Sequence, residues 1–315
     1  MVFDPVAELY SRYPYPPAEP GSRAWKREIN RRSEEGRFIA QTLLSRRPAL
    51  ENGSLLDAGC GTGQKLLGLA QALPDATIVG GDCSPASLAI GRRLLKDAGH
   101  ERVRLVRLDL SKSLPAEASG PFDAVVCDGV LHHLEDPARG LSNLGRVLKP
   151  GGEIWMTVFG KLGRAEMARL RKMLTILEPR FLRFDRRLSI ARMLVKVTGI
   201  LPKRRARRFQ NDSSLADAAL IPRETHFDVV EAVRFLERGG FDRIRWVDGE
   251  PLWEAFLEKA GAAAREIDDE LLGRELSPVD RWRIVELWKR PGMLRFMARK
   301  VETPGGERGE GANAT

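Results

Sequence analysis

The stretch Leu55-Leu56-Asp57-Ala58-Gly59-Cys60-Gly61-Thr62-Gly63-Gln64 decides the fold of this chain. Two apolar residues lead into an acid, three glycines then occupy every second position, and a helical pattern follows from Lys65. A buried strand that ends in a glycine turn and continues into a helix is where an α/β protein holds a nucleotide-like ligand. Glycine suits such a turn because it tolerates positive φ and lets a ligand approach the backbone.

The spacing of these glycines differs from the dinucleotide pattern G-x-G-x-x-G. An acid directly before the turn disfavours an anionic ligand and favours one that carries an ammonium group. S-adenosylmethionine has an ammonium group, a sulfonium and no phosphate. The stretch from Asp57 to Gly63 resembles motif I of class I S-adenosylmethionine-dependent methyltransferases.

Two further acids end the next two expected strands. Thr77–Asp82 ends in Asp82, which can accept hydrogen bonds from both ribose hydroxyls. The segment 103–109 alternates apolar and basic residues and ends in Asp109. The resemblance implies that Asp109 meets the adenine amine and that the Leu110 amide meets the ring. The cofactor-binding set that it implies is Asp57, Gly59, Cys60, Gly61, Gly63, Asp82, Cys83, Asp109, Leu110 and Asp128.

Strand and helix patterns alternate five times between residues 54 and 160, which predicts a doubly wound parallel sheet. A fourth strand is expected at 122–128 and a fifth at 153–159, after a turn at 149–152. A sixth at 243–247 and an antiparallel seventh at 293–299 complete the pattern. The fold class is α/β, with a seven-stranded Rossmann-like methyltransferase sheet and helical insertions.

The N-terminal segment 1–50 is expected to form a lid and a helix. Prolines at 14, 16 and 17 predict an extended segment over 11–17, between a short helix and a helix at 25–47. Tyr10, Tyr13 and Tyr15 belong to a Tyr-Pro leader that resembles those of some bacterial methyltransferases, where this part closes over the cofactor. A lid and a stiff exposed leader both remain open.

Composition limits the classes of protein that fit this chain. Of its 315 residues 43% are hydrophobic and 30% charged, and no run of eighteen apolar residues predicts a membrane span. The start of the chain has no signal-peptide profile. Cys60, Cys83 and Cys127 lie far apart, which predicts reduced thiols, a cytoplasmic protein and no metal site.

The net charge of +9 is concentrated in one segment. Residues 161–208 hold sixteen Lys and Arg against three acids. We expect residues 161–221 to form a basic helical cap over the substrate pocket. In the sequence this cap separates the cofactor-binding core, 51–160, from the rest of the core, 222–302. The second part of the core contains a helical insertion at 250–290, and a disordered tail follows at 303–315. The basic face can be a solvated surface, or it can meet an anionic small-molecule or lipid-like acceptor, an anionic membrane surface or nucleic acid. Nucleic acid is disfavoured because no aromatic residue interrupts the run 203–208.

Methyl transfer depends mainly on aligning the acceptor with the donor and excluding water. A general base helps when the acceptor is a hydroxyl or a protonated amine. The candidates are His132, His133, His226, Asp128 and the leader tyrosines. The sequence therefore predicts a methyltransferase that acts on a small molecule held under the cap. An RNA or protein methyltransferase that docks through the cap, and a cofactor-binding module without activity, remain alternatives.

Overall fold

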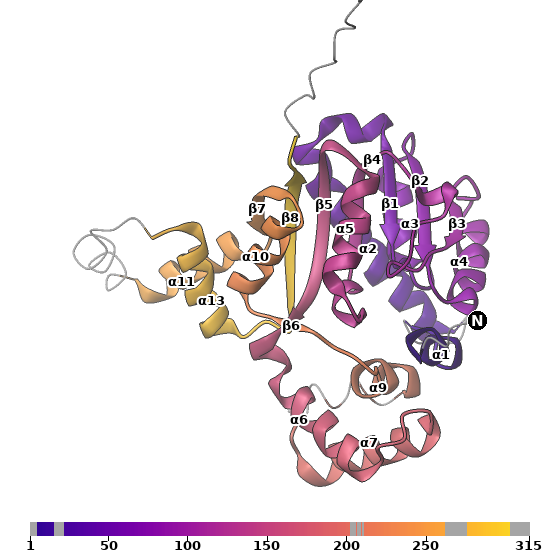
Figure 1. Ribbon diagram of the computed structural model, residues 1–315, viewed down its shortest axis with the longest axis vertical. Helices are drawn as coiled ribbons and strands as arrows, with labels where there is room; N and C mark the ends of the chain where they lie inside the picture. Colours follow the sequence, from indigo (N-terminus) through magenta and orange to yellow (C-terminus); the bar gives the residue numbers. More distant parts are fainter. Residues whose placement is uncertain are drawn as a thin grey trace, which may run out of the picture.

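The computed structural model describes residues 5–15, 22–201, 206, 209, 211–261 and 276–302. Its centre is one mixed sheet with the strand order β3-β2-β1-β4-β5-β8-β7, and β6 pairs with β5 (Figure 1). Only β8 is antiparallel to its neighbours. The predicted fold class is confirmed, with one short strand more than expected. The strands are β1 (Ser54–Ala58), β2 (Thr77–Asp82), β3 (Arg104–Arg107), β4 (Phe122–Asp128), β5 (Leu148–Gly160), β6 (His226–Phe227), β7 (Phe241–Trp246) and β8 (Met293–Lys300).

Helices cover both faces of the sheet, because neighbouring strand residues point to opposite sides. The side chain of Leu55 lies on one face of the sheet, here called the first, and that of Leu56 lies on the second. The first face is covered by α2 (Arg23–Arg46), α3 (Gln64–Ala72) and α4 (Pro85–Asp97). The second is covered by α5 (Pro137–Val147), α10 (Val229–Arg238), α11 (Gly249–Ala260) and α13 (Pro278–Lys289).

Several helices begin where the sequence places a capping side chain. Ser84 accepts a hydrogen bond from the Ser87 amide at the start of α4, and Pro85 takes the first helical position. Asp136 caps α5 in the same way. These ends match the expected strand-to-helix junctions, and they fix the loops that follow β2 and β4.

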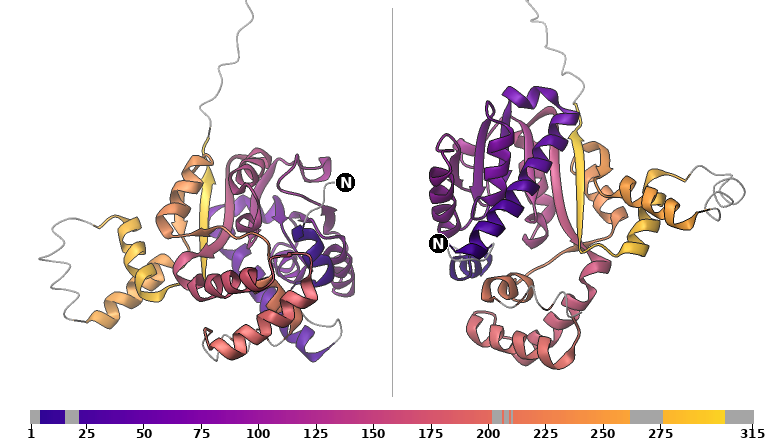
Figure 2. Two further views of the ribbon diagram at one scale, coloured as in Figure 1. Left: turned by 60° about the horizontal axis from the view of Figure 1, so that its bottom comes forward. Right: turned by 180° about the vertical axis from the view of Figure 1, so that it is seen from behind.

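A separate helical lobe lies beyond the carboxyl end of β5. It consists of α6 (Lys161–Leu177), α7 (Phe184–Thr198) and α9 (Asp212–Ala219), and Figures 1 and 2 show it below the sheet. The lobe has its own buried apolar cluster, which also includes Leu9 of α1 (Pro5–Arg12). The N-terminal segment and the lobe therefore share one core, although about 160 residues of sheet and helix separate them in the chain.

Two local expectations were wrong, and one helix was not expected. The helix α1 continues to Arg12, although residues 11–17 were expected to be extended, because Pro14 restricts only Tyr13 before it. The expected turn at 149–152 lies inside β5, where Gly151 has φ +69° and the pairing with β4 shifts register. The sequence reading also missed α9, which Asn211 caps.

Two expected segments fall largely outside the described residues. They are the arginine-rich run 203–208 and the tail 303–315. Among the described residues, no helix is both long and apolar enough to cross a membrane. No group of three or more His, Cys, Asp or Glu side chains in the same residues is arranged to hold a metal ion.

Candidate functional site

The glycine turn after β1 has the conformation that its sequence predicts. Gly59 and Gly61 have φ of +100° and +55°. A Cβ atom on Gly59 would overlap the side chain of Val130, and one on Gly61 would lie 3.2 Å from the Tyr15 carbonyl oxygen. The turn is therefore closed in by the loop after β4 and by the N-terminal segment, and larger residues do not fit there.

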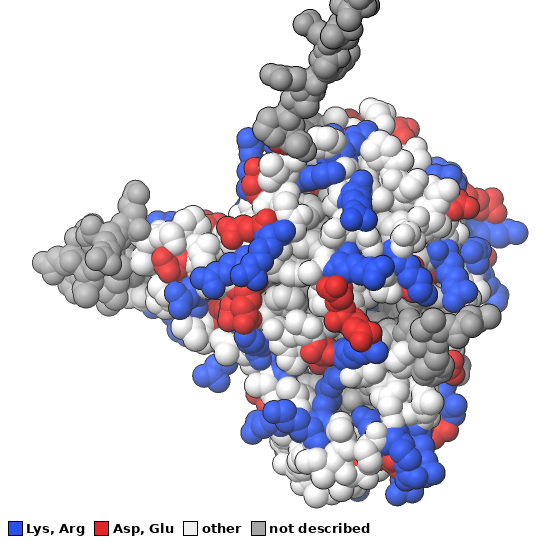
Figure 3. All heavy atoms as spheres, viewed as in Figure 1, with Lys and Arg blue, Asp and Glu red and all other residues white. Residues whose placement is uncertain are grey.

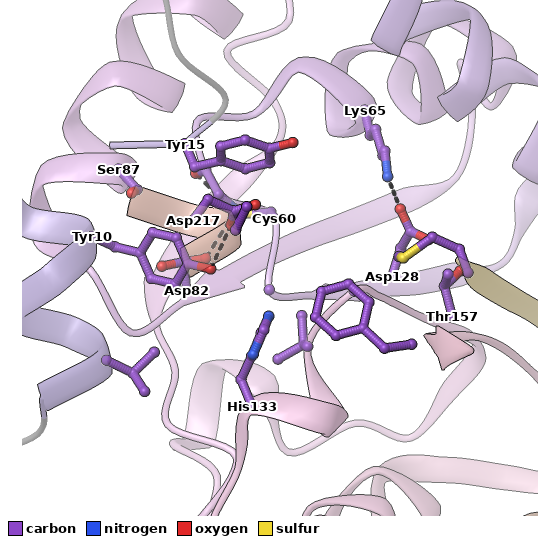
Figure 4. A pocket seen from close by; sticks show the side chains of 18 of the residues that line it. Tyr10, Tyr15, Cys60, Lys65, Asp82, Ser87, Asp128, His133, Thr157 and Asp217 are labelled. Atoms are coloured by element: carbon purple, nitrogen blue, oxygen red, sulfur yellow. Dashed lines mark hydrogen bonds and ion pairs between the residues drawn. The ribbon is translucent and has the colours of Figure 1, made fainter. Parts of the chain in front are cut away.

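A cavity of about 1050 Å³ opens beside this turn and extends to the helical lobe. Figure 4 shows Tyr10, Asp217 and Asp82 on one side, Lys65 and Asp128 on the other, and His133 pointing into the space between. Gly63 does not line the cavity; it is the N-cap of α3. The lining residues from the predicted cofactor set are Asp57, Gly59, Cys60, Gly61, Asp82, Cys83, Asp109, Leu110 and Asp128.

Asp57 lies at the end of β1 with its side chain buried. Burial raises the pKa of its carboxyl group to about 7. Lys65 is the nearest cation, but its ammonium forms an ion pair with Asp128, and burial lowers the pKa of Lys65 to about 8. Within the described residues the Asp57 carboxylate accepts no side-chain or backbone hydrogen bond. A cationic ligand would stabilise its ionised form.

Asp82 is held at the tip of β2 by two backbone donors. Its carboxylate accepts hydrogen bonds from the amides of Gly61 (2.9 Å) and Ser84 (2.8 Å). Burial nevertheless raises the pKa of this carboxyl group. Because each carboxylate oxygen has a second lone pair, Asp82 still has acceptor capacity directed into the cavity.

Asp109 follows β3 and lies at the rim of the same cavity. It accepts hydrogen bonds from the amide and hydroxyl of Ser111 and forms an ion pair with Lys112 at 2.8 Å. Burial opposes ionisation of Asp109, but the hydrogen bonds from Lys112 and Ser111 hold its pKa below the ordinary value. Asp109 is thus an ionised acceptor at the cavity rim.

The leader tyrosines contact three different parts of the protein. The Tyr10 hydroxyl donates to Asp217 of α9 at 2.9 Å. The Tyr13 hydroxyl donates to Asp185 of α7 at 2.9 Å and lies outside the cavity. The Tyr15 hydroxyl accepts from Arg32 of α2 at 3.0 Å. Residues 5–15 therefore bridge the core and the lobe.

Asp217 is a cavity residue that the sequence reading missed. It lies in α9 and lines the cavity, and burial raises its pKa to about 6. Lys65, one position after the quoted motif, was missed as well. A single acid or lysine on a helix carries no signal by itself, because its direction depends on packing across the fold.

The predicted histidine pair divides between two environments. His133 lines the cavity, its Nδ1 lies 3.4 Å from the carbonyl oxygen of Arg223, and burial lowers its pKa to about 4. His132 is fully buried outside the cavity lining, with its ring 3.7 Å from that of Phe159. Only His133 of the pair reaches the cavity.

His226 lies in β6 outside the main cavity, beside a small surface hollow along α6. Its Nε2 lies 2.9 Å from Glu224. Glu224 also pairs with Arg164 at 2.5 Å and Arg171 at 2.6 Å. This cluster connects α6 to the segment before β6. The roles predicted for the three histidines stay predictions, but position favours His133.

Comparison with known proteins supports the same kind of site. Residues 56–154 match the family described as "Methyltransferase domain". The match identifies this part of the chain as a methyltransferase domain. It agrees with the predicted class I S-adenosylmethionine-dependent methyltransferase family and with S-adenosylmethionine as the cofactor. The matched residues run from the middle of β1 into β5, so they contain the glycine turn and the ends of the first four strands.

Curated relatives resemble this chain over part of its length. A protein of Synechococcus sp. without an assigned function is 33% identical over 76% of this chain and 60% of its own length. The demethylmenaquinone methyltransferase of Symbiobacterium thermophilum is 32% identical over 48% of this chain and 55% of its own. The ubiquinone biosynthesis O-methyltransferase of Pseudomonas syringae is 31% identical over 39% of this chain and 51% of its own length. The chain thus spans about half the length of these curated relatives.

The solved structure of PKMT2 from Rickettsia typhi has a similar fold. It superposes with a TM-score of 0.59 at 18% identity and covers 98% of this chain and 54% of its own. Its complex with AdoHcy gives a TM-score of 0.60 at 19% identity, covering 83% and 51%. At this identity the likeness concerns the fold.

Proposed function

We propose that this chain transfers the methyl group of S-adenosylmethionine to a small, lipid-like acceptor held between the sheet and the helical lobe. One observation carries the proposal: a single cavity is lined both by the glycine-turn motif and by residues of α6 and α9. Donor and acceptor can therefore occupy the same enclosed space, as transfer by direct displacement requires.

The residues around the turn fit the cofactor. Asp57 offers a buried carboxylate to an ammonium group, and Asp82 offers acceptor capacity to ribose hydroxyls. Asp109 is an acceptor at the rim, suited to an exocyclic amine. When bound, S-adenosylmethionine supplies a methyl group on a positively charged sulfur.

The part of the cavity beyond the turn favours an apolar acceptor. Phe159, Met167, Leu201 and Met293 line it from β5, α6, the end of the lobe and β8. Two of the curated relatives are named for quinone biosynthesis. A ring compound with a hydroxyl group and an apolar chain, neutral or anionic, fits this lining and these names.

His133 is the side chain that we propose to receive the acceptor's proton. Because burial holds its pKa at about 4, the ring is neutral at pH 7. Donation by Nδ1 to the Arg223 carbonyl leaves the lone pair of Nε2 free to accept a hydrogen bond from an acceptor hydroxyl. His133 would orient that hydroxyl and take up its proton as the oxygen is methylated.

The test is transfer of labelled methyl groups from S-adenosylmethionine to fractions of a bacterial extract. We expect label in the lipid fraction, extractable into organic solvent. Label in RNA or protein instead would contradict the acceptor class, and no transfer to any fraction would contradict the activity.

The His133→Asn variant tests the proton acceptor. We expect kcat to fall about 100-fold or more while the Kd of S-adenosylhomocysteine stays unchanged. His226→Asn is the matched control, because His226 lies outside the cavity lining. Unchanged kcat in His133→Asn would remove this residue from the mechanism.

A further inference from the structure

The helical lobe carries a concentration of exposed apolar side chains. Nine large apolar residues are exposed in the described parts of the chain, and five of them lie between residues 176 and 197. They continue from the end of α6 along α7, and two are more than 70% exposed. These five residues form what we call the apolar part of the lobe surface: Ile176, Leu177, Leu182, Met193 and Val197.

Cations without acidic partners lie just before and among these apolar residues in the sequence. Most arginines of the lobe are paired; Arg180, for example, forms an ion pair with Glu178. Four exposed cations form no ion pair with any described residue, and they complete the lobe surface: Arg169, Lys172, Arg183 and Lys196. Figure 3 shows Lys and Arg side chains beside uncharged surface at the lower end of the molecule.

We propose that the lobe surface docks on a membrane leaflet rich in anionic phospholipids. Aliphatic side chains that project beside unpaired cations are the pattern by which helices lie in a membrane interface. The cations attract the negative headgroups, and the apolar side chains enter the boundary of the acyl chains. A nucleic-acid surface would offer exposed aromatic rings for stacking, and described residues 161–199 expose none.

The lobe that carries this surface also contributes to the cavity lining. Leu201, four residues beyond Val197, lines the cavity, as does Met167 of α6. Docking itself goes beyond the proposed function, because it needs neither the cofactor nor turnover.

Flotation of the full chain with vesicles tests the proposal. We expect binding to vesicles of phosphatidylglycerol and phosphatidylcholine in equal parts, and much weaker binding to phosphatidylcholine alone. The triple variant Lys172→Gln, Arg183→Gln and Lys196→Gln removes three charges. At about fivefold per charge, its partition coefficient should fall about 100-fold. Higher salt should weaken wild-type binding in the same direction.

A second variant separates the apolar contribution from the charges. Leu182→Ser with Val197→Ser should lower binding at every salt concentration, because both changes remove buried apolar area in the docked state. The matched control replaces three exposed cations outside the lobe with Gln: Arg104, Arg146 and Arg234. It should bind vesicles as the wild type does, and equal thermal midpoints would show that all variants fold.

Three results would overturn the proposal. They are equal binding to neutral and anionic vesicles, an equal loss in the control variant, and binding of a labelled RNA without binding of vesicles. Because the measurement uses no cofactor, such a failure would leave the methyltransferase proposal intact. Conversely, an absence of methyl transfer would not affect the vesicle result.

Discussion

Replacement of Asp57 by Asn tests how the buried carboxylate takes part in cofactor binding. Burial raises the pKa of Asp57 to about 7 in the cofactor-free protein. If only the ionised form binds the ammonium group, the observed Kd rises by the factor 1 + 10^(7 − pH). This factor is about 2 at pH 7 and about 11 at pH 6, whereas the Asn variant has no such term.

Calorimetric titration with S-adenosylhomocysteine between pH 5.5 and 7 measures this dependence. An α-amino group remains protonated throughout that range. We expect the wild-type Kd to increase about fivefold from pH 7 to pH 6. Asp57→Asn should bind more weakly and with a flatter profile, although Asp217, whose pKa is about 6, can leave a residual slope. An identical slope in both proteins would refute the assignment of this titration to Asp57.

The same substitution weakens ligand binding but should stabilise the cofactor-free protein above about pH 4. The folded-state pKa of Asp57 lies above its unfolded value, so the folded protein loses stability as the pH rises from about 4 to about 7. Asn cannot ionise and does not show this loss. The thermal midpoint of the cofactor-free variant should therefore exceed that of the wild type by more at pH 8 than at pH 5.

Three further predictions concern the cavity and its support. Asp82→Asn weakens the acceptor held by the Gly61 and Ser84 amides, so calorimetry should show a 10- to 100-fold higher Kd for S-adenosylhomocysteine, about 1.5–3 kcal/mol. Tyr10→Phe removes the hydrogen bond from the N-terminal segment to α9, and limited proteolysis near the N-terminus should become several-fold faster, consistent with about 1 kcal/mol. Gly68→Ala should lower the free energy of unfolding in urea by about 1–3 kcal/mol, because its Cβ would overlap a carbonyl oxygen of α2. The control Gly145→Ala, whose Cβ would lie 3.8 Å from the Phe241 ring, should be neutral or stabilising.

The sheet could be predicted because its signals are local. Each of the first two strands is a short apolar run with an acid at or next to its end, and Ser84 marks where the helix after the second strand begins. The start of β5 could not be predicted, because Gly151 forms a bulge where its sequence looks like a turn. A turn and a bulge use the same residues, and only the pairing partner distinguishes them.

Some residues of the cavity could likewise be predicted from the sequence and others could not. Asp57, Asp82 and Asp109 could be found because each lies within two residues of the carboxyl end of a strand. Asp217 could not, because packing of the lobe brings α9 against Tyr10. The burial of His132 could not be predicted either, because adjacent histidines in a short 3₁₀ turn point in different directions.

The core shared by α1 and the lobe has a consequence for synthesis. Leu9 leaves the ribosome about 200 residues before its packing partners in α9. During translation the first five strands can pair before α9 is made, while the N-terminal helix lacks its packing partners. The N-terminal segment beside the glycine turn therefore reaches its final position late. A nascent chain halted before residue 212 would expose the glycine turn at the carboxyl end of β1.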